Sequence, residues 1–292
     1  MTNVTILESP TRTTPLGVRF WDAVQQKFVA DGLVVNVRLA ASQRRIPAVA
    51  NKEGVFYARD LPFLAAAERG AGDDAYWAAL SSLGFIVEVS DANGQFLSFS
   101  FPAQLPARGV FVWSCASASP VVPSSLSAGV PLFSAPSRSE VAMCGTLRAQ
   151  LQEASTGLPA AGAVLHATIA GTEQATGIAD ALGRVAMLFP YPEPQDFPPI
   201  GDPSASPVAS PTGSSLTGHT WPVTLTVQYA PTTGPYPPYP DLCTTLSQPS
   251  AQLLADTSGA QLGPQTLYVG TDLIVRSVDA ATGTPLSVVL VT

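Results

Sequence analysis

The stretch GIADALGRVAMLFPYP, residues 177–192, joins a turn to an apolar strand and decides the predicted fold. Asp180 can accept hydrogen bonds from backbone N–H groups two residues further on and so begin a turn. Gly183, three positions later, can adopt the left-handed conformation that closes the turn. The apolar run that follows can then return to a core as a strand. This local pattern predicts β structure.

The same pattern occurs earlier in the chain, in AVANKEGVFYARDLPF, residues 48–63. Here Asn51 takes the place of Asp180, and Gly54 takes the place of Gly183. In both stretches an apolar segment follows the glycine and ends near a proline. We therefore expect the same turn and the same returning strand in both halves of the chain.

The blocks upstream of these turns also match. FVADGLVVNVRL (residues 28–39) aligns without gaps with LPAAGAVLHATI (residues 158–169), which places Gly32 on Gly162. Short turn patterns recur by chance, but two separate blocks in the same order make chance a poorer explanation. The repeat predicts two related β-sandwich domains in tandem.

Composition supports this fold class. Of the 292 residues, 46% are hydrophobic and only 12% are charged, against about 25% charged in an average globular protein. The 28 Pro and 23 Gly are scattered, which favours short strands and turns over long helices. We predict an all-β protein with two tandem Ig-like or transthyretin-like sandwich domains, one short helix and long Pro-rich loops.

Changes in composition along the chain predict its domain boundaries. The segment around residues 119–137 is rich in Ser, Ala and Pro and has the composition of a linker. The segment near residues 191–220 is too rich in Pro and Ser for regular structure. The predicted order is an extended arm (1–14), a first sandwich (15–118) with a helical insert near 63–82, the linker (119–137), and a second sandwich (138–292) containing the Pro-rich insert.

Net charge excludes one class of partner. The chain has a formal charge of -7 and only 14 Lys and Arg. The densest basic position, Arg44 with Arg45, is interpreted as a solvated hairpin tip. No basic run is long enough to neutralise a series of phosphates, so we expect no nucleic-acid partner.

The cysteines are few and far apart. Cys115, Cys144 and Cys243 form no Cys-x-x-Cys pair. This pattern predicts reduced thiols in a protein made in the cytosol, and leaves open one bridge such as Cys115–Cys144.

The N-terminal stretch has no basic start followed by an apolar core, so the sequence predicts no Sec signal peptide. No window approaches 18 uninterrupted apolar residues, so no membrane insertion is expected. We expect a protein made in the cytoplasm without a signal peptide, in a cytoplasmic or released particle.

The second unit resembles a carboxypeptidase regulatory-like domain, which is a transthyretin-like β-sandwich. The resemblance rests on STGLPAAGAVLHATIAG and TGIADALGRVAMLFPY, within residues 155–191. These contain a Thr-Gly-x-Pro-x-x-Gly-Ala opening and a Thr-Gly-x-x-Asp-x-x-Gly turn. The first unit departs from the pattern, because DAVQQKFVADG (residues 22–32) lacks the Thr-Gly-x-Pro part. The topology implied by the resemblance is therefore less certain in the first unit.

A broader resemblance covers the whole chain. Residues 17–39, 85–111 and 131–151, together with LFPYPEP (residues 188–194), resemble proteins of bacterial contractile injection systems, which are phage-tail-like particles. That resemblance implies a structural component of a particle without catalysis of its own.

Few side chains in the sequence are candidates for catalysis. Nucleophilic hydrolysis of the Ser-His-Asp type needs a histidine base, and only His166 and His219 exist. His166 occupies a polar position on a predicted strand. His219 lies in a loop near Ser214 and Ser215, but no Gly-x-Ser-x-Gly elbow is present. A cryptic hydrolase is therefore a minor alternative.

Metal and nucleotide sites are also not predicted. Two His and three Cys, widely separated, give no zinc pattern. The oxygen-rich turns at residues 72–74, 90–94 and 278–283 do not reproduce an EF-hand and are interpreted as hairpin turns. No Gly-rich phosphate loop occurs. We predict no catalytic, cofactor-binding or metal-binding residues.

The aromatic residues leave one alternative function open. Trp221, Tyr229, Tyr236 and Tyr239 could bind sugar if they formed a shallow exposed row, although core packing and an extended Tyr-Pro arm explain them as well. The preferred hypothesis is a non-enzymatic assembly protein that contacts other subunits of a particle, with homo-oligomerisation left open. A carbohydrate-binding or adhesion module is the alternative.

Overall fold

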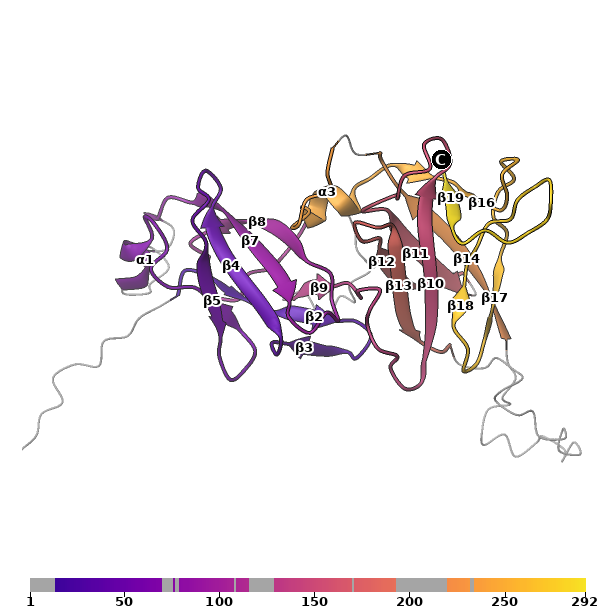
Figure 1. Cartoon of the computed structure of the whole chain (residues 1–292). Coiled ribbons are helices and arrows are strands. Elements are labelled where there is room, and N and C mark those ends of the chain that lie inside the picture. The colour runs from indigo at the N-terminus through magenta and orange to yellow at the C-terminus, as the bar shows by residue number, and fades with distance from the viewer. Residues whose placement is uncertain are drawn as a thin grey trace, which may run out of the picture.

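The computed structural model describes residues 14–69, 76, 79–107, 109–115, 129–169, 171–192, 220–231 and 234–292. The described chain is almost entirely β structure, which confirms the predicted all-β class. Helices α1 (Ala65–Arg69) and α3 (Leu242–Leu246) are five residues each. Two β-sandwich units lie side by side, the first unit in residues 14–137 and the second unit in residues 138–292 (Figure 1).

The first unit contains a six-stranded sheet and a three-stranded sheet. The six-stranded sheet has the order β1-β6-β5-β4-β7-β8, with bounds Gly17–Val18 (β1), Phe56–Tyr57 (β6), Ile46–Ala50 (β5), Leu33–Leu39 (β4), Leu83–Asp91 (β7) and Phe99–Leu105 (β8). The three-stranded sheet has the order β3-β2-β9, with bounds Lys27–Val29 (β3), Phe20–Asp22 (β2) and Val130–Leu132 (β9).

The second unit contains two five-stranded sheets. One has the order β13-β10-β19-β16 with β18 also on β10, and its bounds are Arg184–Pro190 (β13), Cys144–Glu153 (β10), Val289–Val291 (β19), Leu253–Leu254 (β16) and Leu273–Ile274 (β18). The other has the order β12-β11-β14-β15 with β17 also on β14, and its bounds are Thr172–Ile178 (β12), Val164–Ile169 (β11), Thr220–Gln228 (β14), Ser250–Ala251 (β15) and Gln265–Tyr268 (β17).

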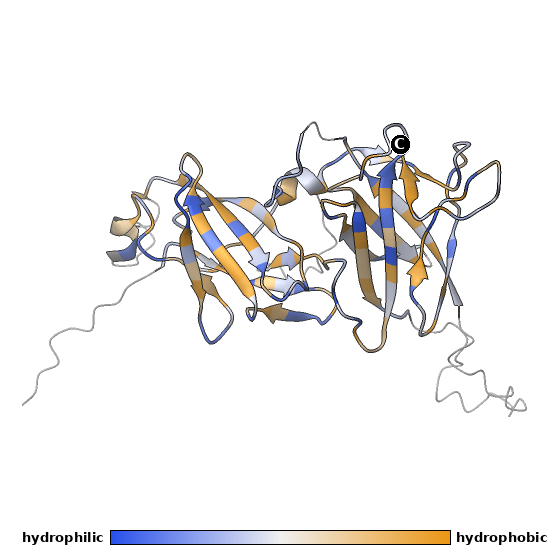
Figure 2. Cartoon of the chain, in the orientation of Figure 1, coloured by the Kyte–Doolittle hydropathy of each residue, from blue (hydrophilic) through white to orange (hydrophobic). Residues whose placement is uncertain are grey.

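The strand pattern follows from residue alternation. In β11, Leu165, Ala167 and Ile169 are buried, while His166 and Thr168 between them are partly exposed. This is the period of two that a half-buried strand requires. Figure 2 shows the same alternation of polar and apolar residues along β4 and β10.

The repeat seen in the sequence is present in the structure. Asp180 accepts hydrogen bonds on Oδ1 from the backbone N–H groups of Leu182 and Arg184, at 2.8 and 2.9 Å. Asn51 likewise accepts from the N–H groups of Glu53 and Val55, both at 2.9 Å. Both turns close on a glycine, Gly54 or Gly183, with a φ of 74°. The predicted turns are confirmed in both units.

The repeat extends to the pairing of strands. Strand β10 pairs antiparallel with β13 through its first seven residues and parallel with β19 through its last three. In the first unit these partners are divided between two short strands, because β1 pairs antiparallel with β6 and β2 pairs parallel with β9. Strand β9 therefore takes the place in the first unit that β19 takes in the second.

This position of β9 differs from the predicted linker over residues 119–137. Val130 is buried and pairs with Phe20, and Phe133 and Ala135 are also buried. This edge strand could not be recognised from the sequence because it has only three residues, and its surroundings are rich in Pro and Ser. Residues 119–128 of the predicted linker lie outside the described residues, as do residues 1–13 of the predicted arm and residues 193–219 of the predicted insert.

The core of the first unit extends across the junction between the units. Its cluster of buried side chains includes Phe20, Phe85 and Phe101 from the first unit. It also includes four residues of the second unit, which are Val164, Ile178, Leu242 and Leu246. The second unit has its own cluster around Leu147, Leu165 and Phe189.

Candidate functional site

The connection between β14 and β15 leaves the second unit and lies against the first. The Ser100 N–H donates to the carbonyl of Pro240 at 2.8 Å, and the Ser100 hydroxyl donates to the carbonyl of Tyr239 at 3.1 Å. Asp241 forms a parallel bridge with Ser100. Because Ser100 lies in the edge strand β8, this connection satisfies part of an edge that would otherwise be open to pairing.

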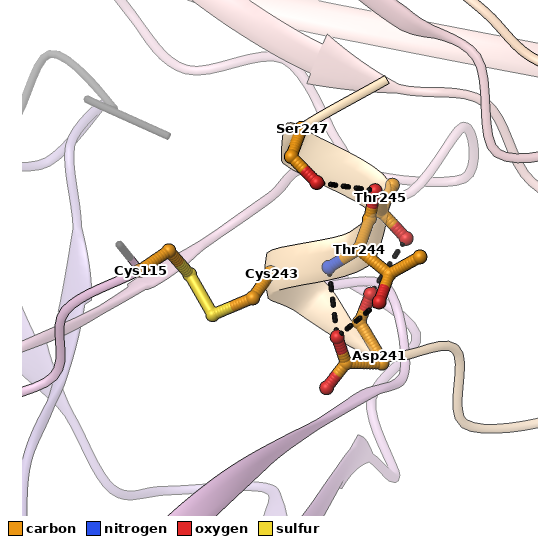
Figure 3. Close-up of a disulfide and its surroundings, with 6 residues drawn as sticks. All are labelled: Cys115, Asp241, Cys243, Thr244, Thr245 and Ser247. Carbon is orange, nitrogen blue, oxygen red and sulfur yellow. Dashed lines mark hydrogen bonds between the residues drawn. A yellow bond between two sulfur atoms is a disulfide. The ribbon is translucent and has the colours of Figure 1, made fainter. Parts of the chain in front are cut away.

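Helix α3 continues this connection and packs on the first unit. Asp241 is its N-cap, with Oδ1 accepting from the Thr244 N–H at 2.7 Å (Figure 3). Leu242 and Leu246 are buried in the core of the first unit. A helix of five residues is not stable alone, so its cap and its packing on the first unit must hold it in place.

A disulfide between Cys115 and Cys243 joins α3 to the first unit (Figure 3). The two cysteines are 128 residues apart in sequence. The prediction of reduced thiols is therefore wrong for this pair, and the bridge that was left open is not Cys115–Cys144. Cys144 is free, and burial raises the pKa of its thiol.

A second group of contacts fixes the chain where it passes from one unit to the other. Arg138 forms a buried ion pair with Asp22, with Nη2 and Oδ2 2.6 Å apart, and donates to the Ser134 hydroxyl at 3.0 Å. Arg148 in β10 donates to the carbonyl of Pro136 at 2.7 Å. The passage between the units is thus bonded to both of them.

An apolar groove with a volume of 210 Å³ lies at this junction. We call it the junction groove. Both units and the β14–β15 connection contribute to its lining, which consists of Leu97, Ser98, Phe99, Phe133, Ile178, Ala179, Asp180, Ala181, Tyr236, Pro237, Pro238, Pro240, Leu242 and Thr245. The Asp180–Gly183 turn from the repeat therefore forms part of its wall.

Tyr236 is the principal polar side chain of the groove. Its ring lies against Gly162, where an added Cβ would stand 2.8 Å from the ring, so the close approach requires glycine. Burial, and then the negative charge of Asp180, raise the pKa of Tyr236 to about 12. The phenol is therefore protonated at neutral pH. The Asp180 carboxylate forms an ion pair with Arg184, whose Nη2 lies 2.7 Å from Oδ2.

This geometry determines what the groove can do. Its lining is mainly aromatic, aliphatic and proline side chains, and its carboxylate is neutralised by an arginine. Such a surface gains free energy by removing apolar side chains from water. The groove suits an apolar protein segment better than a charged substrate.

The structure separates the aromatic residues considered for sugar binding. Tyr229 is buried in the core of the second unit, and Trp221 stacks on Tyr191 with ring centroids 5.5 Å apart. Tyr236 lines the junction groove, and Tyr239 lies under the Arg45 guanidinium at 5.5 Å. These four residues do not form one shallow exposed row.

His166 lies on the outer face of its sheet. Its Nδ1 is 2.9 Å from Glu173 Oε1 and 3.2 Å from the Thr176 hydroxyl. A catalytic triad would place the acid and the nucleophile on opposite ring nitrogens, whereas here both lie on Nδ1. His219, Ser214 and Ser215 lie outside the described residues.

The oxygen-rich turns are used for backbone hydrogen bonds. Asp91 accepts N–H groups from Asn93, Gln95 and Phe96, and Asp279 accepts them from Ala281 and Thr282. In the described part of the chain, no three His, Cys, Asp or Glu side chains gather in a way that could hold a metal ion. Residues 72–74 lie outside it. The absence of metal and cofactor sites stays a prediction.

None of the helices in the described ranges is both long enough and apolar enough to cross a membrane.

The residues that build the junction were not predicted from the sequence. Asp241 followed by LCTTL is an N-cap signal that could have indicated α3. Nothing local indicated that Cys243 would meet Cys115, or that Arg138 would meet Asp22, because both pairs are far apart in sequence and depend on how the units pack.

No protein-family model matches the chain, and no curated protein matches it in sequence. Among solved structures, it is similar to the Bacillus anthracis TIE protein, with 9% identity and a TM-score of 0.22 over 90% of this chain and 33% of that one. It is also similar to BcpA, the major pilin subunit of Bacillus cereus, with 10% identity and a TM-score of 0.22 over 83% of this chain and 58% of that one. The chain thus spans about a third and just over half of these proteins. At such TM-scores we draw no conclusion from either.

Proposed function

We propose that the protein is a non-catalytic structural subunit that acts through protein–protein contacts made by two firmly joined β-sandwich units. One observation carries this proposal. The junction is covalently linked, buried and hydrogen-bonded on both sides, and it leaves an apolar groove at its surface. When the angle between the units is fixed, the groove is already formed before a neighbour binds. Binding then loses little conformational entropy for ordering the groove.

We further propose that the neighbours are other subunits of a contractile injection system or a similar phage-tail-like particle. The support for this finer assignment is the resemblance of three long stretches of sequence to proteins of such particles. The low content of charged residues, 12%, is consistent with surfaces that become buried in an assembly.

The occupant proposed for the junction groove is an apolar side chain or a short apolar segment of a neighbouring subunit. A substitution at the groove rim tests this directly. Ala181 is exposed and lines the groove, in the position after the turn residue Asp180. Ala181→Glu places a charge in the groove, where burial against a neighbour would require its desolvation.

Ala280→Glu provides a matched control. Ala280 is also exposed and also follows an aspartate that begins a turn, Asp279, but it does not line the junction groove. The measurement is the fraction of each variant that co-sediments with the assembled particle from cells that make it. We expect a fall of about tenfold or more for Ala181→Glu and wild-type incorporation for Ala280→Glu, with unchanged melting temperatures. Equal incorporation of both variants would disprove the assignment of the groove.

A further inference from the structure

A second hollow, on the first unit, concentrates positive charge in an otherwise acidic chain. We call it the arginine hollow. It has a volume of 400 Å³ and is lined by Arg44, Arg45, Ile46, Pro47, Val49, Tyr57, Arg59 and Asp60. The β4–β5 hairpin supplies Arg44 and Arg45. Val49 pairs with Tyr57, so the chain that continues to Arg59 runs back alongside the start of β5.

Among the described residues, ion pairs leave this charge largely uncompensated. Across the part of the chain that the structure describes, no acidic side chain forms an ion pair with Arg44 or Arg59. Arg45 contacts Glu88, with Nε 2.5 Å from Oε2, but Glu88 also pairs with Arg38 at 2.8 Å. With Arg38 balancing Glu88, the three arginines against Asp60 leave two net positive charges.

The buried carboxylate of Glu88 holds Arg45 in place. Burial raises the pKa of Glu88, but hydrogen bonds and charges from Arg45 and Arg38 outweigh it, so the pKa lies below its ordinary value. Although Glu88 is only 3% exposed, its two arginine partners therefore keep it ionised at neutral pH. It orients one arginine of the hollow, while Arg44 and Arg59 remain available to a ligand.

The distribution of charge along the chain makes the hollow unusual. Residues 1–137 carry 10 Lys and Arg against 10 Asp and Glu, whereas residues 138–292 carry 4 against 11. The whole net charge of -7 thus belongs to the second unit, and the first unit is neutral overall. A local excess of arginine on a neutral unit can attract an acidic partner that the second unit would repel.

The side chains between the arginines favour a polypeptide over a sugar. The Arg59 guanidinium already lies over the Tyr57 ring, 5.0 Å from its centroid, and so occupies a face on which a sugar would stack. Pro47 and Val49 are exposed beside it, and Val49 is 56% exposed. Carboxylates flanked by aliphatic groups, as in an acidic peptide, complement this combination.

We propose that the arginine hollow binds an acidic segment of a neighbouring protein chain, through Arg44 and Arg59 to its carboxylates. This inference rests on the proposed contact function and names the chemistry of one partner. It uses a surface separate from the junction groove, so the two proposals can fail independently.

The test uses the full chain and a ten-residue peptide that alternates Glu with Val, with a Gln-Val peptide of the same length and polygalacturonate as comparison probes. Binding is measured by titration calorimetry at low and physiological salt. We expect the Glu-Val peptide alone to bind, with an affinity that falls as salt increases. Arg44→Gln with Arg59→Gln should weaken binding about tenfold.

Lys52→Gln with Arg276→Gln removes the same charge from exposed positions outside the hollow and should leave the affinity unchanged. Sedimentation of the protein alone at rising concentration identifies the neighbour. If the protein self-associates and the Arg44/Arg59 double variant does not, the acidic segment belongs to a second copy of this chain. If the protein stays monomeric, the acidic segment belongs to a different protein. The proposal would be overturned if the Glu-Val peptide did not bind, if both double variants weakened binding equally, or if only polygalacturonate bound.

Discussion

Gly183 shows how one residue links the repeat in the sequence to the packing of the second unit. It closes the turn that Asp180 begins, with a φ of 74°. Its carbonyl accepts the Leu151 N–H at 2.7 Å, so the turn is held against β10. An added Cβ would lie 2.2 Å from the Leu151 carbonyl oxygen, which is backbone and cannot move aside.

Gly183→Ala should therefore be strongly destabilising. The left-handed backbone costs a non-glycine residue about 1 kcal/mol, and the collision adds about 1–3 kcal/mol. Gly270→Ala is the control, because Gly270 also has a φ of 74° but has open space at the Cβ position. Urea denaturation should show a loss of about 2–4 kcal/mol for the first variant and about 1 kcal/mol for the second. Equal losses would show that backbone conformation alone matters at Gly183.

At the same scale, sequence patterns predicted local hydrogen bonding better than exact backbone angles. The hairpin between β7 and β8 turns within residues 90–94, which the sequence predicted as a hairpin turn, but of Asn93 and Gly94 only Gly94 has a positive φ. The Asp91 carboxylate organises the turn instead, by accepting three backbone N–H groups. The position of the turn could be predicted because few residue types favour turns. Which groups satisfy the backbone hydrogen bonds of the turn depends on the neighbouring side chains.

Among the elements, α3 and its disulfide decide how the two units are joined. Leu242 and Leu246 insert into the core of the other unit, and Cys243 between them is bonded to Cys115. A covalent link between residues 128 apart restricts the unfolded chain more than the folded one.

Cys115→Ser and Cys243→Ser should each lower the free energy of unfolding by about 2–4 kcal/mol, and the double variant should lose no more than either alone. Reductant should bring the wild-type protein to the same level and leave both variants unchanged. Cys144→Ser removes the free thiol and should have little effect. Denaturation that is insensitive to reductant, or a large loss in Cys144→Ser, would contradict this role for the disulfide.

The elements of the sheets could be predicted from sequence, but the junction could not. Strands such as β11 and β14 show clear alternation of polar and apolar residues. The matching sequence blocks identified β4 as the counterpart of β11 in the repeat. The three-residue strand β9 was concealed by its Pro- and Ser-rich surroundings. The contacts of α3, the Cys115–Cys243 bridge and the Arg138–Asp22 pair are products of packing between distant segments, which local patterns do not encode.

In the whole molecule, the two units are joined as one body. The core of the first unit includes side chains of the second, and a disulfide and a buried ion pair also join the two units. Two independent modules on a flexible linker would need neither a shared core nor a covalent bond. Relative motion of domains is expected unless their interface is large and hydrophobic, so the shared apolar core favours a fixed angle between the groove and the arginine hollow.

The most direct test of the contact function is electron cryomicroscopy of the native assembly that contains this chain. We predict that the protein forms an ordered subunit of a large particle, with both units in the relative orientation described here and a neighbouring subunit seated in the junction groove. A protein that remains monomeric in the cells that make it, with the groove open to solvent and no ordered neighbour, would contradict the account.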